Sequence, residues 1–237
     1  MLLGAAVLAI GQVHQHGLTW SGLFDDLYAN FGSELVGMAM VILLIDRFAA
    51  RREDERVRRQ LVRELASTDR GLTTRAALEL EAKGWLTDGT LQGAQLSGAN
   101  LSGVRLERAQ LSDAALAGAT MASCNLSGAR LTRANLADAN LDRANLEMAD
   151  LAGAALPQAT LTDADAGLAN FVHADLSGAK LAGTDLTGAN LTGSDLCGTD
   201  LTRAVLTRTI LTAVRWDAHT RWPTGFEPAV TDSPDEE

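Results

Sequence analysis

The chain has 237 residues, and 30 Asp and Glu against 20 Lys and Arg give it a formal net charge of −10. The excess is spread unevenly, because residues 86–216 hold 9 basic and 13 acidic groups whereas the last 21 residues hold 1 and 6. A nucleic-acid-binding surface needs clustered Lys and Arg, and residues 86–216 are mildly acidic, so direct nucleic-acid binding is not expected. The two cysteines are too few to form a disulfide framework.

Residues 1–50 contain two apolar runs and form a predicted hydrophobic anchor region. The first run, Met1–Ile10, makes a helix of only about 15 Å, half of a bilayer core, so a first span over residues 1–13 is a short one. The second run, Leu35–Ile45, extends to a predicted span over residues 31–49. The alternative interpretation of the second run is a buried helix of a soluble protein.

A basic stretch comes directly after the second run, and basic residues beside a span mark the cytoplasmic side of a membrane. The repeat domain is therefore expected on the cytoplasmic side of the membrane. Residues 51–86 are predicted to form a charged helix over Arg51–Leu65 and an N-terminal cap helix over Thr73–Lys83, which Gly84 ends. Trp85 is then expected to lie over the first coil of the repeat segment, which begins at residue 87. The arginines of the basic stretch are Arg47, Arg51, Arg52, Arg56, Arg58, Arg59 and Arg63.

A five-residue period runs through residues 87–215. Of the 25 positions from Leu91 to Leu211, 22 are Leu, and the exceptions are Met121, Ala166 and Phe171. The residue two places before is always small, with 18 Ala among 24 positions. A period of five fits neither the 3.6 of a helix nor the 2 of a strand, so the chain must turn a corner once per repeat.

A solenoid with flat faces satisfies this pattern, with Leu and the small residue inside and the other three positions outside. Gly often stands two places after the Leu, where a tight turn tolerates it. At the adjoining exceptions, either Ala166 and Phe171 compensate each other in volume or Gly167-Leu168 marks an irregularity. The interior ladder is predicted to include Leu91, Leu101, Leu136, Leu141, Leu146, Leu186, Leu191, Ala134, Ala139 and Ala144.

Stretches such as Ala134-Asn135-Leu136 and Ala189-Asn190-Leu191 resemble the pentapeptide-repeat family, whose consensus is A-(D/N)-L-x-x. The resemblance implies an all-β solenoid, a right-handed quadrilateral β-helix with four repeats per coil. With 25 repeats we expect about six coils and a rod roughly 30 Å long. The amino-terminal part resembles a bacterial group of this family with a membrane anchor, through DLYAN at residues 26–30, IDR at 45–47 and GWL at 84–86.

A C-terminal cap and an acidic tail are predicted over residues 216–237. Trp216 falls on the next interior position after Leu211, and Trp222 and Phe226 come soon after it in a chain that is otherwise poor in aromatic residues. An exposed last coil needs such a cap. The alternative is a disordered tail that happens to contain aromatics.

No catalytic, cofactor-binding or metal-binding signature is present, so neither enzymatic activity nor a cofactor is expected. His14 and His16 form an isolated pair, His173 is outward in a repeat, and His219 lies in the predicted cap. A rod whose interior is filled by Leu and Ala leaves no concave pocket.

Two functions from different classes are consistent with these features. The first is a non-enzymatic, membrane-anchored scaffold that presents its β-helix to an unidentified protein partner. The second, implied by the family resemblance, is a soluble DNA mimic that binds a topoisomerase such as DNA gyrase, often as a homodimer joined through a terminus. The mild charge of the rod and the predicted span favour the scaffold.

Overall fold

The computed structural model describes residues 20–228, with side chains described from residue 38 onward except at residue 50. The predicted short span over residues 1–13, His14, His16 and most of the acidic tail lie outside the described residues. The chain divides into two compact units, Met1–Arg56 and Val57–Glu237. This boundary falls inside the segment 51–86, which the sequence pattern groups as one.

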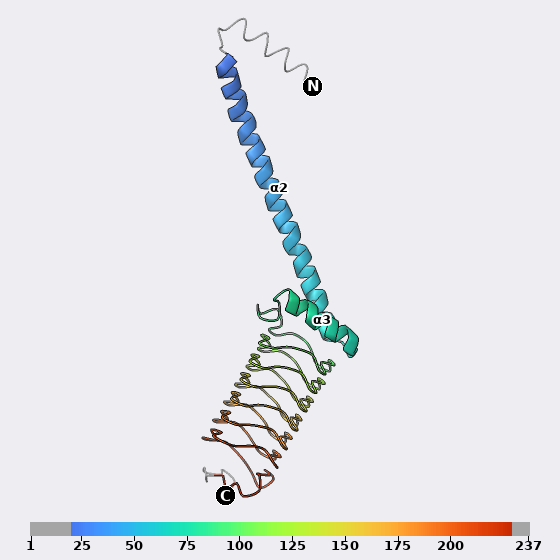
Figure 1. Cartoon of the computed structure of the whole chain (residues 1–237), viewed down its shortest axis with the longest axis vertical. Coiled ribbons are helices and arrows are strands. Elements are labelled where there is room, and N and C mark those ends of the chain that lie inside the picture. Colours follow the sequence, from blue (N-terminus) through green and yellow to red (C-terminus); the bar gives the residue numbers. More distant parts are fainter. Residues whose placement is uncertain (1–19, 229–237) are drawn as a thin grey trace. The chain divides into compact units, whose positions relative to one another are not determined.

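Helix α2, Trp20–Leu65, is 46 residues long and is continuous where two separate helices were predicted (Figure 1). The junction at Ala49-Ala50-Arg51-Arg52 contains strong helix formers and no Gly or Pro, so nothing ends the helix there. The side chains from Met38 to Ile45, except Ala39, and that of Phe48 are large, apolar and between 48% and 68% exposed. This stretch of α2 is therefore apolar on all sides.

Within the residues that are described, no helix is both long enough and apolar enough to cross a membrane. The side chains of residues 31–37, which complete the predicted span over residues 31–49, lie outside that description.

The second unit begins with a helical cap. The last turns of α2 bury Leu61 and Leu65, and helix α3, Arg70–Ala82, buries Thr73, Ala76, Ala77 and Leu80. Helix α3 starts three residues before the predicted Thr73, because the Asp69 carboxylate caps it by accepting from the backbone N–H groups of Gly71 (2.7 Å) and Leu72 (3.2 Å). It ends as predicted beside Gly84, whose φ is 71°, and the Trp85 N–H bonds the Leu80 carbonyl.

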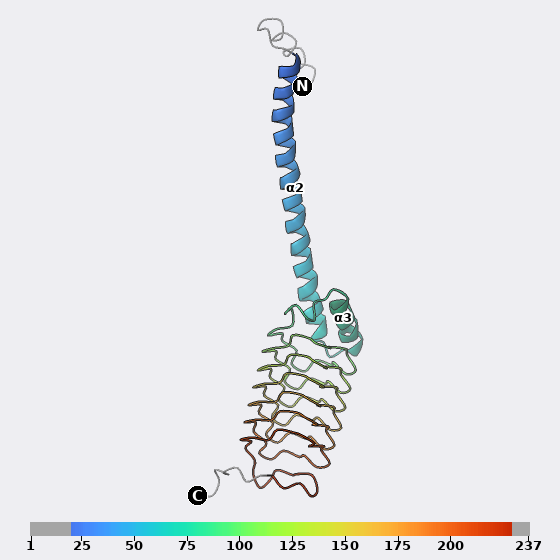
Figure 2. The same cartoon turned by 60° about the vertical axis from the view of Figure 1, so that its left-hand side comes forward.

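The remainder of the unit is a β-helix, drawn as the stacked coils in Figures 1 and 2. Parallel bridges join residues 20 positions apart, from Gln95 with Ala115 to Asp195 with Arg215, so one coil contains four five-residue repeats. From Leu96 to Leu201 the interior residue of each repeat donates to the next coil, as Leu96 N–H does to Ala115 O at 2.7 Å, and the outward residue donates back, as Ala115 N–H does to Ala94 O. These hydrogen bonds pair neighbouring coils at every fifth residue and so hold the coils in a constant register of 20 residues.

The interior rows are buried as the pattern predicts. Every residue of the predicted interior ladder is at most 1% exposed, and the small residues Thr184 and Thr199 bond the carbonyls of Leu161 and Leu176 with their hydroxyl groups. Ala166 and Phe171 are both fully buried, and the 20-residue register continues through them from Asp165 to Asn190. The two exceptions therefore change side-chain volume without interrupting the coil.

The corners depend on the second residue after each interior position. At all 25 of these positions φ is positive, between 54° and 74°, and only 11 are Gly. The other 14 include Arg, Asp, Met, Leu and His. A left-handed conformation is strained for such residues, so the turn geometry is imposed by the stacked coils rather than by glycine alone.

Both ends of the β-helix are covered by other segments of its unit. At the amino-terminal end, Ser67 O and Leu86 O accept the N–H groups of Asn100 and Gln110, and the Thr73 hydroxyl donates to Asn100 O. At the carboxyl-terminal end, Trp222 meets Trp216 edge-on with ring centres 6.2 Å apart and stacks on Phe226 at 5.2 Å. Trp85 is 9% exposed, whereas Trp216, Trp222 and Phe226 are half-buried.

Candidate interaction surfaces

The interior of the β-helix offers no site, because it is filled by Leu and Ala. Among the described residues, no group of three or more His, Cys, Asp and Glu is placed to hold a metal ion. The surface has an open groove of about 380 Å³ beside the end of α2, lined by Arg58, Arg59, Val62, Arg63, Ala66, Thr90 and Gln95. Arg58 is already engaged there, because it pairs with Asp88 at 3.0 Å and its guanidinium lies over the Trp85 ring.

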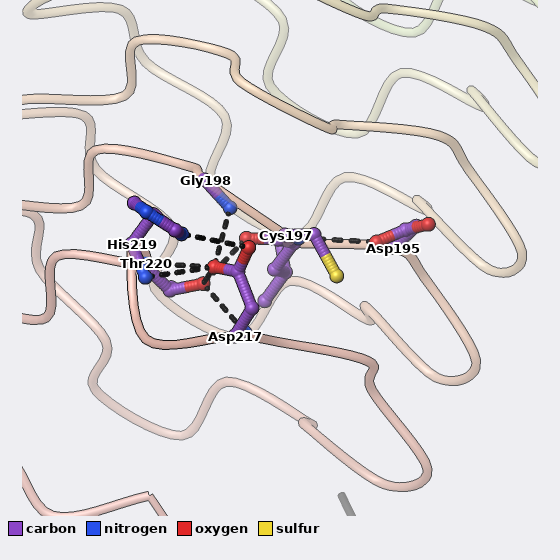
Figure 3. Close-up of polar contacts among 7 residues, drawn as sticks. Asp195, Cys197, Gly198, Asp217, His219 and Thr220 are labelled. Atoms are coloured by element: carbon purple, nitrogen blue, oxygen red, sulfur yellow. Dashed lines mark hydrogen bonds and ion pairs between the residues drawn. The ribbon is translucent and has the colours of Figure 1, made fainter. Parts of the chain in front are cut away.

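The most connected polar cluster is a turn at the carboxyl-terminal end, shown in Figure 3. One oxygen of Asp217 accepts from the backbone N–H groups of Gly198 (2.8 Å), His219 (3.0 Å) and Thr220 (3.0 Å). The other oxygen lies 3.4 Å from His219 Nδ1. The hydrogen bond from Gly198 is the main reason that the pKa of Asp217 falls to about 2.

This turn continues the hydrogen bonding between coils. In the coils before it, Gly178 N–H bonds the backbone carbonyl of Cys197, and at Gly198 the Asp217 side chain takes over that role. The turn holds one extra residue, so the next bridge joins Asp200 to Arg221, 21 positions away. Sequence reasoning did not identify the turn, although the Asp-x-x-Thr spacing of residues 217–220 is a recognisable turn signal.

The two cysteines and the two described histidines lie in different surroundings. Burial raises the pKa of the Cys124 thiol to about 12, and burial followed by nearby Asp195 raises that of Cys197 to about 11, so both are thiols at neutral pH. Cys124 donates to the Val104 carbonyl inside the coil, whereas Cys197 is half-buried on the surface. His173 occupies a corner, and His219 belongs to the Asp217 turn.

The outer faces carry the varied chemistry of the chain. The outward Asp and Asn side chains fold back onto the backbone two residues later, as Asn140 does to Asp142 N–H at 2.9 Å. Arginines bridge neighbouring coils on either side of the middle of the rod, as in Arg133–Asp113 at 2.8 Å, Arg215–Asp195 at 3.1 Å and Arg221–Asp200 at 3.0 Å. Between them, residues 134–190 hold eight acidic groups and two basic ones, which leaves the middle of the rod distinctly negative.

Comparison with protein families now identifies the repeat. The model for pentapeptide repeats matches the chain in eight copies, over residues 90–128, 109–148, 129–165, 144–181 and 169–208. The chain belongs to the pentapeptide-repeat family. The matched stretches run from residue 90 to residue 208, about half of the chain, and membership implies a right-handed quadrilateral β-helix, with which the 20-residue register agrees.

Solved structures of several pentapeptide-repeat proteins are similar to this chain. Rfr23 from the cyanobacterium Cyanothece 51142 is 38% identical with a TM-score of 0.40, over 40% of this chain and 65% of that protein, so the chain spans less than two thirds of it. HetL from Nostoc sp. PCC 7120, which is involved in regulating heterocyst differentiation, is 27% identical with a TM-score of 0.26, over 52% and 76%.

QnrB1, a plasmid-mediated fluoroquinolone resistance protein, is 16% identical with a TM-score of 0.26, over 54% of this chain and 79% of that protein. A comparison with curated proteins gives no significant match.

Proposed function

We propose that this chain is a non-enzymatic protein-interaction module that a bacterial inner membrane holds through α2, with the β-helix on the cytoplasmic side. The observation that supports the interaction role is the difference between the interior and the outward positions of the repeat. The interior rows are uniform and buried, whereas the outward positions vary from Lys and Arg to Asp, Leu and Met. A solenoid with a filled interior and varied flat faces is suited to binding another macromolecule rather than to enclosing a substrate.

Membrane attachment is supported by the sequence of α2. Residues 28–45 contain Glu34 as their one charged residue, and the described part from Met38 to Ile45 is apolar around the whole helix. An all-round apolar helix is stable when protein or lipid covers it. Six of the seven arginines in the basic stretch lie between Arg47 and Arg59, which supports a cytoplasmic position for the β-helix.

The second candidate, a soluble DNA mimic that binds a topoisomerase, is favoured by one observation. The net charge of −6 over residues 134–190 is denser than that of the rest of the rod. The coils on either side of this segment do not share it, because Arg133, Arg215 and Arg221 neutralise neighbouring carboxylates there. The acidic character is therefore confined to the middle coils, which fits a local docking surface better than a charged rod.

The experiment combines fractionation with photo-crosslinking in intact bacterial cells. A photoreactive amino acid replaces the central outward residue of each face in turn, at Asn145, Ala155, Thr160 or Asn170, in a full chain with a carboxyl-terminal tag. We expect the tag in carbonate-washed membranes, protected from protease in spheroplasts, with light-dependent adducts from at least one face. A soluble tag would reject the anchor, and adducts from none of the faces would reject the interaction role.

The DNA-mimic alternative has its own assay. The purified chain is added to a DNA gyrase supercoiling reaction. Inhibition at micromolar concentrations by a chain that fractionates as soluble would favour the mimic over the anchored module.

A further inference from the structure

Two neighbouring coils carry an apolar ridge on one corner of the β-helix. Met148 and Leu168 occupy the same corner position of repeats 20 residues apart, and Met148 N–H bonds Gly167 O at 2.9 Å between the two coils. Their side chains are 57% and 60% exposed. Between residues 91 and 200, all of them described, no other large hydrophobic side chain is exposed.

The fold does not require these two side chains. Both residues lie in the left-handed region, with φ of 56° and 57°, and the same corner column holds Gly128 and Gly188 in the coils on either side. In the Leu168 repeat, the glycine is at position 167, one residue before the corner position that adopts the left-handed conformation. The strained corner position is therefore occupied by an exposed leucine. Leu168 leans over Gly188, yet most of its surface stays in contact with solvent. A residue that neither the turn nor the core needs is available for binding.

Four carboxylates border the ridge. Glu147 and Asp150 lie one and two residues from Met148, Asp165 lies three residues before Leu168, and Asp185 is bridged to Asp165 in the next coil. No Lys, Arg or His in the described part of the chain forms an ion pair with any of the four. In contrast, Asp113, Asp195 and Asp200 each have an arginine partner.

The ridge also has defined ends. The corner positions that stack above and below the ridge, one every 20 residues, begin with Arg108 and finish with Arg208. Each of these arginines is two coils away from the nearer ridge residue. Positive side chains at both ends, and carboxylates without an ion pair between them, favour the binding of a basic ligand at the middle coils.

We propose that Met148, Leu168 and the surrounding carboxylates of Glu147, Asp150, Asp165 and Asp185 dock a basic segment of a partner protein. An apolar side chain of that segment lies between Met148 and Leu168, and flanking Lys or Arg side chains face the carboxylates. Anionic ligands such as nucleic acid are repelled by this charge. The inference rests on the proposed interaction function and names the surface and the chemistry of the partner.

The test uses short peptides as probes of the purified full chain. The probe is Arg-Arg-Gly-Leu-Gly-Arg-Arg with a fluorinated leucine, observed by fluorine NMR. Its analogues replace Leu by Ser or all four Arg by Glu, and each competes against the fluorinated probe. We expect the Leu and Arg peptide to bind about tenfold more tightly than either analogue, and more weakly as salt rises.

Matched variants of the protein locate the binding. Met148→Gly together with Leu168→Gly removes the ridge and places at both corners the residue that Gly128 and Gly188 already provide, so the fold is preserved. Asp165→Asn with Asp185→Asn removes two charges while keeping the side-chain bond that Asn145 makes at the same position. Asp138→Asn with Asp175→Asn changes the net charge equally on other parts of the coil.

We expect the ridge variant to weaken binding about tenfold, the first charge variant severalfold, and the control variant less than twofold. Equal losses in all three variants, or a Ser peptide that binds as tightly as the Leu peptide, would overturn the proposal. Crosslinked adducts in cells from Ala155 or Thr160 but not from Asn145 or Asn170 would also overturn it, while leaving the interaction function intact.

Discussion

Replacing Leu141 by Ala tests the interior of the β-helix. Leu141 is fully buried, with Met121 and Leu161 in the same interior column one coil before and one coil after it. The coil backbones on both sides are fixed by hydrogen bonds such as Leu141 N–H to Thr160 O at 2.7 Å, so they cannot collapse into the space. Because the cavity persists, we expect a loss of about 3 to 5 kcal/mol, the upper range for this substitution in protein cores.

The matched control is Leu211→Ala, the same change in the last coil, where the side chain is only half-buried. Less apolar surface returns to water there, so we expect a loss of roughly 1 kcal/mol. Urea unfolding monitored by circular dichroism gives both free energies of unfolding, with a second probe to check for unfolding from one end, as repeat proteins permit. Equal losses at the two positions would refute the argument that the interior cannot relax.

Three further outcomes are expected. Arg143→Ala should change the free energy of unfolding by no more than about 0.5 kcal/mol, because Arg143 is an exposed corner residue, and a larger loss in the same urea assay would contradict the outward register. The pKa of Asp217 in the folded protein is about 2, below its ordinary value of 3.8. The ionised carboxylate therefore stabilises the fold fully above pH 3.8, and this stabilisation is lost as pH falls from about 4 to 2. The difference in stability between the natural chain and Asp217→Asn should therefore shrink over that range, and a difference independent of pH would contradict the assigned hydrogen bonds. Because burial raises the pKa of Cys197 to about 11, this thiol should react with a maleimide far more slowly at pH 7 than free cysteine does, and a normal rate would show that the site is more open than described.

The sequence predicted the β-helix because its two interior rows obey a rule that neither a helix nor a regular strand satisfies. Leu at every fifth position and a small residue two places earlier specify which side chains are buried. Thr184 and Thr199 show that the small interior position also accepts a hydroxyl group when that group can donate to a backbone carbonyl inside the coil. The cap was predicted less well. The start of α3 was misplaced because the signal is Asp69, a capping residue outside the apolar pattern, and the continuity of α2 was missed because a change in composition at Arg51 is not a helix stop.

The surface could not be predicted in the same way, because the outward positions do not determine the fold. The Asp217 turn depends on one carboxylate replacing a backbone carbonyl, which becomes visible only when Gly198 and Asp217 are brought one coil apart. The ridge likewise appears only when residues 148 and 168 are stacked in one corner column and their exposure is known.

A repeat fold changes where functional information can be found. Each coil is held by the same hydrogen bonds and the same interior Leu. The outward positions can therefore vary with little loss of stability, and most residues there give no information about function. A departure that costs stability is different, because folding alone selects against it. Gly167 beside a left-handed, exposed Leu168 is such a departure, because glycine tolerates the left-handed position better than leucine does and the core does not need the Leu168 side chain. This inverted order stands at a corner that the carboxylates of Asp165 and Asp185 border, and it is therefore better explained by binding than by folding.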